Sequence, residues 1–199
     1  APGSVAAEIA GTPVRVEVNT DYPFRERVDL TVRAKQPVRF GLLLRVPAWA
    51  EGAGLQISDE PLLPLAAGEF FRLERHWEGA VSLSLHLPMP PRVERGERGS
   101  VALTRGPLVY ALRIGEDWRQ LAGEPPHADW EVYPTTPWNY GLVLDPSAPA
   151  RDVEFAERPL GARPFSPEGA PVLATARGRR LPGWEIEHNA AAPPPPSPA

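Results

Sequence analysis

The stretch Val81-Ser82-Leu83-Ser84-Leu85-His86-Leu87 decides the fold of this chain of 199 residues. Its apolar residues occupy every second position, and the positions between them hold serine or histidine. Because side chains on a β-strand alternate between the two faces of a sheet, this pattern predicts a strand that is buried on one face and solvated on the other.

The same alternation recurs through the first half of the chain. Apolar residues follow the same phase in four further segments, which are 14–18, 28–32, 38–46 and, interrupted by Arg75, 70–77. Turn residues such as Asp21-Tyr22-Pro23 separate these segments about every 8–12 residues, a spacing typical of β-sandwiches. No segment shows the 3.6-residue period of a helix, and the 27 prolines disfavour long helices. The chain is therefore predicted to be all-β.

Residues 88–99 interrupt the alternation with prolines and charges, and we expect a domain boundary there. The first β-sandwich is predicted over 1–95 and the second over 96–190, as two consecutive antiparallel, jelly-roll-like domains. Further strands are expected at 101–103, 108–114, 130–133, 138–144, 153–155 and 172–176, and an irregular segment at 116–127. A proline-rich tail is expected over 191–199, because consecutive prolines cannot join the interior of a sheet.

Composition argues against several classes of protein. The net charge of −4 provides no positive field for phosphate backbones, so nucleic acid is a poor partner. No apolar stretch approaches the roughly 20 residues that span a bilayer, so no membrane partner is expected. The chain has no cysteine and a single lysine among its many arginines. This composition suggests a bacterial source and leaves the compartment open, and we favour a soluble cytoplasmic protein over a secreted one. The N-terminal Ala1-Pro2-Gly3-Ser4 lacks an initiator methionine and is typical of a fragment.

Reactive groups show no catalytic or metal-binding pattern. No two of the histidines are spaced as metal ligands; they are His76, His86, His127 and His188. Glu116 with Asp117, and Asp129 with Glu131, could in principle hydrolyse a glycoside. However, 25 acidic residues produce such pairs by chance, and solvated strand faces explain them. We therefore predict no catalytic, cofactor-binding or metal-binding residue in this chain.

The six tryptophans suggest one binding hypothesis. An indole ring offers a planar apolar face with a polar edge, on which a sugar ring can stack. Trp77 shares the phase of buried neighbours and is expected in the core. Trp118, Trp130 and Trp138 lie close to expected loops, and these three are the candidate carbohydrate platform.

Five stretches of the chain, taken together and in order, resemble a known family. They are 20–24 (TDYPF), 44–49 (LRVPAW), 75–79 (RHWEG), 101–112 (VALTRGPLVYAL) and 133–140 (YPTTPWNY). The resemblance is to the C-terminal part of glycoside hydrolase family 127, the β-L-arabinofuranosidase-like enzymes of the six-hairpin glycosidase group. It covers most of residues 12–187.

The resemblance implies a non-catalytic role. In the family, an N-terminal (α/α)6 barrel performs retaining hydrolysis with a zinc-bound cysteine thiolate as nucleophile and a glutamate as acid/base. The present chain resembles only the β-sandwiches that follow the barrel, so no catalytic residue carries over and zinc is expected only in the barrel. Family members continue past a proline-rich stretch like 192–198 into another strand. The second sandwich is therefore expected to lack its last strand and to expose an edge.

The leading hypothesis is a non-catalytic accessory region of a family-127-like glycosidase. It would brace the barrel of the same parent chain and possess no enzyme activity alone, and it could form a homodimer. The alternative is a carbohydrate-binding module that uses the exposed tryptophans. A third class, an interaction scaffold, predicts a broad apolar surface patch.

Overall fold

A computed structural model of the protein describes residues 2–196. Within these residues, regular structure consists of β-strands and two short 3-10 turns, Glu97–Gly99 and Pro149–Arg151, which confirms the predicted all-β class. The chain divides into two compact units. Unit 1 holds Ala1–Pro90 and Arg105–Leu108, and unit 2 holds Pro91–Thr104 and Val109–Ala199. The domain limits 1–95 and 96–190 stay a prediction.

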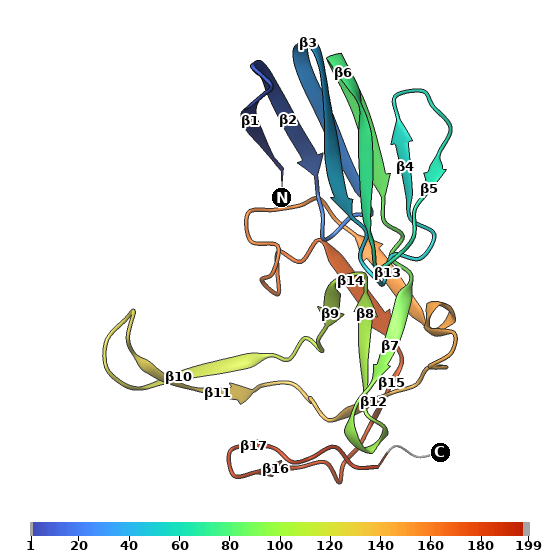
Figure 1. The fold of residues 1–199 in the computed structure, drawn as a ribbon. Coiled ribbons are helices and arrows are strands. Elements are labelled where there is room, and N and C mark those ends of the chain that lie inside the picture. Colours follow the sequence, from blue (N-terminus) through green and yellow to red (C-terminus); the bar gives the residue numbers. More distant parts are fainter. Residues whose placement is uncertain (1, 197–199) are drawn as a thin grey trace. The chain divides into compact units, whose positions relative to one another are not determined.

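Unit 1 is built on one antiparallel sheet of six strands in the order β1-β2-β3-β6-β4-β5 (Figure 1). The strands are β1 (Gly3–Ile9), β2 (Thr12–Thr20), β3 (Arg27–Arg45), β4 (Gly54–Ile57), β5 (Leu63–Pro64) and β6 (Phe70–His86). The two long strands, β3 and β6, pair along their whole length, with one irregularity in register between Ala34 and Val38.

The long paired strands β3 and β6 double back on themselves. A straight strand of 19 residues would be roughly 60 Å long at 3.2–3.4 Å per residue. Yet residues 46–53, which reach at most about 30 Å, join the far end of β3 to β4, and β4 pairs with the end of β6 that lies beside the start of β3. Residues 38–45 and 70–77, beyond the irregularity, therefore form a second layer. This second layer lies over the first layer, which is formed by residues 27–34 and 79–86 with the strands that pair with them. The turn comes at the irregularity, because a bulge bends a strand and lets it pass between layers.

The apolar faces of the two layers meet in a single core. Leu83, Leu85 and Leu87 are buried, whereas Ser82 and His86 of the opposite phase are exposed, as the alternation predicts. Trp77 is fully buried, and its indole Nε1–H donates a hydrogen bond to the carbonyl oxygen of Phe40 at 3.0 Å. Burial of each large apolar side chain contributes about 1.5–3 kcal/mol, so this sandwich-like core accounts for the stability of unit 1.

The outer faces of unit 1 hold interleaved charges. Glu17 bridges Arg15 and Arg33 on the first layer, and Glu74 bridges Arg39 and Arg72 on the second. These ion pairs are exposed, so each contributes little to stability, on the order of 0–1 kcal/mol. Their effect is to keep the outer faces hydrated.

Residues Arg105–Leu108 complete unit 1 beside the end of β6. The carboxylate of Glu26 accepts a hydrogen bond from the backbone N–H of Met89 at 2.8 Å, and its other oxygen lies 3.2 Å from Nε2 of His86. Arg105 donates from Nε to the carbonyl oxygen of Met89 at 3.3 Å. Gly106, with a φ of +57°, then brings the backbone against the buried Met89 side chain.

Unit 2 consists of short strands. It holds β7 (Pro91–Arg95), β8 (Val101–Arg105), β9 (Leu108–Tyr110), β10 (Glu116–Ala122), β11 (Asp129–Pro134), β12 (Tyr140–Leu142), β13 (Val153–Glu157), β14 (Val172–Ala176), β15 (Gly178–Arg180), β16 (Ile186–Glu187) and β17 (Ala190–Ala191). The first three form one sheet, and the others form the antiparallel pairs β10-β11, β12-β15, β13-β14 and β16-β17. The last residue of β8, Arg105, and the first residue of β9, Leu108, belong to unit 1.

Unit 2 buries few large apolar side chains; among the described residues they are Leu103, Val153 and Val172. Each two-stranded pair leaves one edge of each strand without a ladder partner within residues 2–196.

A missing last strand of the second sandwich stays a prediction. The segment 116–127, expected to be irregular, instead contains β10. Residues 193–196 of the predicted tail lie outside any strand, and residues 197–199 lie outside the described part of the chain.

Candidate functional site

Two of the three candidate tryptophans lie on one hairpin of unit 2, formed by β10 and β11. We call residues 116–134 the Trp arm. Its two strands pair only with each other, and in Figure 1 the hairpin stands away from the other strands of unit 2. Its turn requires Gly123, which has a φ of +75° and whose Cβ, if present, would lie 2.9 Å from the carbonyl oxygen of His127.

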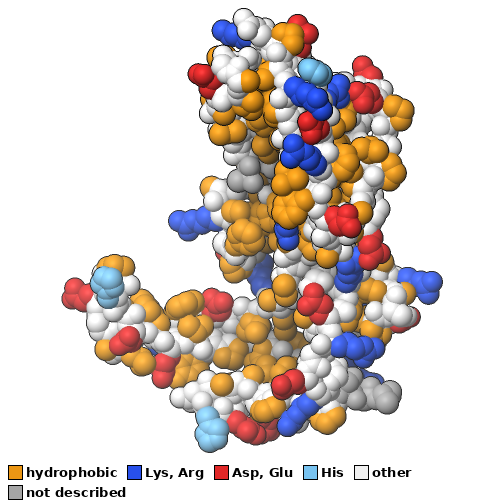
Figure 2. Space-filling model, in the orientation of Figure 1, with side chains coloured by type: hydrophobic (Ala, Val, Ile, Leu, Met, Phe, Trp, Pro, Cys, Tyr) orange, Lys and Arg blue, Asp and Glu red, His pale blue; other side chains and the backbone are white. Residues whose placement is uncertain are grey.

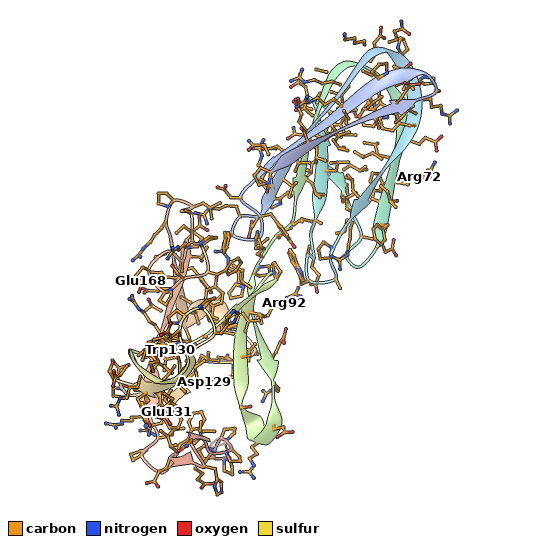
Figure 3. The ribbon with its side chains drawn as sticks, turned by 90° about the vertical axis from the view of Figure 1, so that its left-hand side faces the viewer. Arg72, Arg92, Asp129, Trp130, Glu131 and Glu168 are labelled. Atoms are coloured by element: carbon orange, nitrogen blue, oxygen red, sulfur yellow. The ribbon has the colours of Figure 1, made fainter. Side chains whose placement is uncertain are left out.

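One face of the Trp arm combines indole rings with polar side chains. Glu116, Trp118 and Gln120 alternate along β10 and so share this face with Trp130 and Val132 of β11. Trp118 is 57% exposed and Trp130 is 45% exposed. Their ring centroids lie 6.1 Å apart with the planes at 75°, so the two indoles form a corner. Figure 2 shows hydrophobic side chains along the arm, and Figure 3 labels Trp130 together with its neighbours Asp129 and Glu131.

Hydrogen bonds hold the polar groups of this face in place. The Nε1–H of Trp118 donates to a carboxylate oxygen of Glu116 at 2.8 Å, which fixes the orientation of the indole. Gln120 donates from its amide nitrogen to the carbonyl oxygen of Gly123 at 2.6 Å. The part that Glu116 and Gln120 play beside Trp118 was not predicted, although their two-residue spacing from Trp118 is a signal that places all three on one strand face.

The opposite face of the Trp arm is an ionic network. The guanidinium of Arg119 lies 2.8 Å from Asp117 and stacks 4.4 Å from the ring centroid of Tyr133. The hydrogen bond and the charge of Asp117 raise the pKa of Arg119. The Tyr133 hydroxyl donates to Glu131 at 2.7 Å, and this hydrogen bond, with the negative charge of Glu131, raises the pKa of Tyr133 above its ordinary value of 10.0.

Glu131→Gln is expected to lower the pKa of Tyr133 toward the value of a free tyrosine. The substitution removes the carboxylate that accepts the phenolic proton and that repels a phenolate. Because the folded-state pKa is the higher one, the contribution of this pair to stability is present below the unfolded pKa and is lost as pH rises through the folded pKa. NMR titration of ring-labelled tyrosine measures the change, with Tyr22 as internal comparison. An unchanged Tyr133 titration in the variant would contradict the network.

Trp138 lies four residues beyond the Trp arm and has a different aromatic neighbour. It is partly buried against Trp184, with ring centroids 5.1 Å apart and planes at 68°. Trp184 donates from Nε1 to the carbonyl oxygen of Ala192 at 2.7 Å, and the neighbouring Asn139 donates to the carbonyl oxygens of Leu181 and Trp184. These contacts connect Trp138 and Asn139, which precede β12, to residues 181–192. A platform role for Trp138 stays a prediction.

The carboxylate pairs considered in the sequence analysis lie on the Trp arm. Glu116 and Asp117 point to opposite faces of the arm, whereas Asp129 and Glu131 share the ionic face. Within residues 2–196, no three histidine, aspartate or glutamate side chains gather closely enough to hold a metal ion. Nor does any helix in that range have the length and apolar character needed to cross a membrane.

Two hollows lie on the surface of unit 1 among the residues that the structure describes. One is open and lies where β3 and β6 double back, beside Ala34 and Gly79. The other, of about 240 Å³, is lined by small polar side chains on the outer face of the first layer, among them Thr31, Ser82 and Ser84. Neither hollow has an aromatic side chain in its lining. The corner on the Trp arm is therefore the more distinctive candidate site.

Comparison with known proteins gives a match in unit 1. Residues 1–89 match the family model for the middle domain of GH127 β-L-arabinofuranosidases. No curated protein matches the chain.

Several solved structures are similar to the chain. One is Ara127N, a GH127 β-L-arabinofuranosidase from Geobacillus stearothermophilus T6, at 21% identity, a TM-score of 0.49, and coverage of 66% of this chain and 28% of that one. Another is the GH127 β-arabinofuranosidase BT3674, at 15% identity, a TM-score of 0.47, and coverage of 73% of this chain and 28% of that one. A third, described as a glycoside hydrolase, has 22% identity, a TM-score of 0.45, and coverage of 54% and 19%. The chain thus spans little more than a quarter of the length of the first of these proteins.

Proposed function

Because residues 1–89 match a GH127 middle domain, as the sequence resemblance predicted, we propose that this chain is the accessory β-sandwich region of a β-L-arabinofuranosidase-like glycoside hydrolase. In this proposal the chain is not catalytic and braces an (α/α)6 barrel of the same parent protein. The match over unit 1 is the observation that carries the proposal. Zinc and the catalytic thiolate are assigned to the barrel, since this sequence contains no cysteine.

An apolar patch on unit 1 supports a bracing role. Leu43 and Phe70 are 60% and 62% exposed, and they lie on the outer face of the second layer. Arg72 is the cross-strand partner of Leu43, and Arg45 is that of Phe70, so the two apolar side chains lie diagonally across the β3–β6 pair beside two cations. Apolar side chains surrounded by charge are typical of protein-contact surfaces. We call these two residues the Leu43–Phe70 patch and assign the barrel to it.

The bracing role is tested with the barrel that the parent gene encodes, expressed as a separate chain. Leu43→Asp and Phe70→Asp should each weaken its binding to this chain about tenfold or more, since each removes apolar contact area and brings a carboxylate that must lose its hydration in the interface. Val5→Asp is the matched control, because Val5 is 61% exposed on β1 of the first layer. Binding that is equally strong in all variants would contradict the patch, and no binding at all would contradict bracing.

The non-catalytic assignment has its own test. The purified chain, incubated with zinc and an aryl β-L-arabinofuranoside, should show no turnover above the blank, and any turnover would refute the assignment.

Dimerisation through this region is proposed as well and is measured by sedimentation equilibrium. A cytoplasmic location is proposed for the parent, to be tested by fractionation of the source bacterium.

A further inference from the structure

The corner between Trp118 and Trp130 has features that bracing a barrel does not require. We propose that it is a binding site for a neutral carbohydrate, with the two indoles as the apolar surfaces and with Glu116 and Gln120 as the hydrogen-bonding groups. The site lies on the Trp arm in unit 2, whereas the family match lies in residues 1–89. The inference therefore does not depend on bracing.

The arrangement of the rings suits a sugar. The C–H face of a sugar ring stacks on an indole face, and the hydroxyl groups project from its rim. With ring planes at 75° and centroids 6.1 Å apart, one indole can lie beneath a sugar while the other stands at its side. The hydrogen bond from Trp118 to Glu116 holds the first indole in position before a ligand arrives, which reduces the entropy lost on binding.

The polar groups on the same face favour a sugar over an apolar protein surface. Glu116 and Gln120 lie two residues before and two residues after Trp118, so they flank its ring. Their carboxylate and amide groups can exchange hydrogen bonds with sugar hydroxyls. An apolar protein surface would instead strip water from the Glu116 carboxylate without supplying donors, and that desolvation is unfavourable.

The two indoles alone are too small an apolar surface for a stable homodimer. At 57% and 45% exposure, two aromatic side chains of about 150–250 Å² each offer roughly 200 Å² together. A stable dimer needs about 800 Å² from each partner. One or two sugar rings require far less area, so the corner is suited to a small ligand.

The charge of the face selects among sugars. Glu116 is the one ionisable side chain that β10 and β11 place on the tryptophan face, and the arginine of the arm lies on the opposite face. A uronic acid would bring its carboxylate close to Glu116 and be repelled. The proposal is therefore for neutral rather than acidic glycans.

Affinity electrophoresis in native gels tests the site, because it detects weak binding to soluble polysaccharides. The probes are neutral arabinoxylan, galactomannan and mixed-linkage β-glucan, with acidic polygalacturonate for comparison and a gel without polymer as reference. At least one neutral polymer should retard the protein. Trp118→Ala and Trp130→Ala should each weaken that binding about tenfold or more. Tyr133→Phe, on the opposite face of the same arm, is the matched control and should bind normally.

The raised pKa of Tyr133 shows whether the arm still folds in the tryptophan variants, because it depends on contacts across the opposite face. Loss of binding with this pKa preserved would support the site. Retardation by none of the neutral polymers would overturn the proposal. The proposal would also be overturned if both tryptophan variants were still retarded, or if Tyr133→Phe lost retardation to the same extent as they did. Stronger retardation by polygalacturonate than by any neutral polymer would overturn it as well. The two proposals can fail separately. The outcome of the barrel-binding test on the Leu43–Phe70 patch of unit 1 does not change the result of the gels, which report on the Trp arm of unit 2.

Discussion

Trp77→Ala is expected to destabilise unit 1 by about 3–5 kcal/mol, the cost typical of removing a buried tryptophan. Trp77 is fully buried, stacks on Phe40 with ring centroids 5.2 Å apart, and donates a hydrogen bond to the Phe40 carbonyl oxygen. It lies just beyond the point where the paired strands β3 and β6 double back. The substitution therefore leaves a cavity between the two layers and removes a polar contact that joins the paired strands.

The free energy of unfolding of unit 1 can be measured in urea with amide hydrogen exchange as the probe. Exchange at residues of β3 and β6 reports on unit 1 alone. His76→Ala is the matched control, since His76 is the exposed neighbour of Trp77 on the same strand, and we expect a change within about 0.5 kcal/mol. Trp77→Phe should fall between the two, because it keeps an aromatic ring but loses the indole donor. A cost below about 1 kcal/mol for Trp77→Ala would contradict the packing described for this core.

The strands β2, β3 and β6 of unit 1 are predictable from sequence because burial there follows a period of two, whereas β1, which has no buried residue, was not predicted. Val32, Leu83 and Trp77 each lie in the apolar phase of their strand, and each is buried. The alternation missed the continuity of β3, which the sequence divides into the segments 28–32 and 38–46. Its apolar phase continues across the irregularity at Ala34 and Val38, and the doubling back depends on contacts between residues distant in sequence, which no local pattern records.

For the Trp arm, the sequence predicted the candidate residues but not the strand β10 that carries one of them. Its tryptophans were singled out by their position near expected loops, yet β10 was expected to be irregular. Along β10, Trp118 lies between charged or polar neighbours on both sides, so the strand has no apolar period of its own. Pairing with β11 creates the shared face, because Trp118 and Trp130 become diagonal neighbours only when both strands are in register. A binding corner of this kind arises from pairing and cannot be read from either strand.

Gly106→Ala is the second substitution with a large expected effect, about 2 kcal/mol or more. A residue other than glycine in the left-handed region costs roughly 1–2 kcal/mol, and Gly106 has a φ of +57°. The added Cβ would also lie 2.7 Å from the Cγ and Sδ atoms of Met89. Met89 is 3% exposed, so its side chain has little room to move away.

A double-mutant cycle separates the two causes. Met89→Ala alone should cost about 2–5 kcal/mol through lost burial. Combined with Gly106→Ala, it removes the atoms that the new Cβ would meet but leaves the backbone strain, so the double variant should be more stable than the sum of the single effects by about 1 kcal/mol. Urea unfolding of the four proteins gives this coupling energy. Strict additivity would mean that the strain at Gly106 alone sets the cost, and that Arg105–Leu108 does not pack on Met89 as the structure of unit 1 requires.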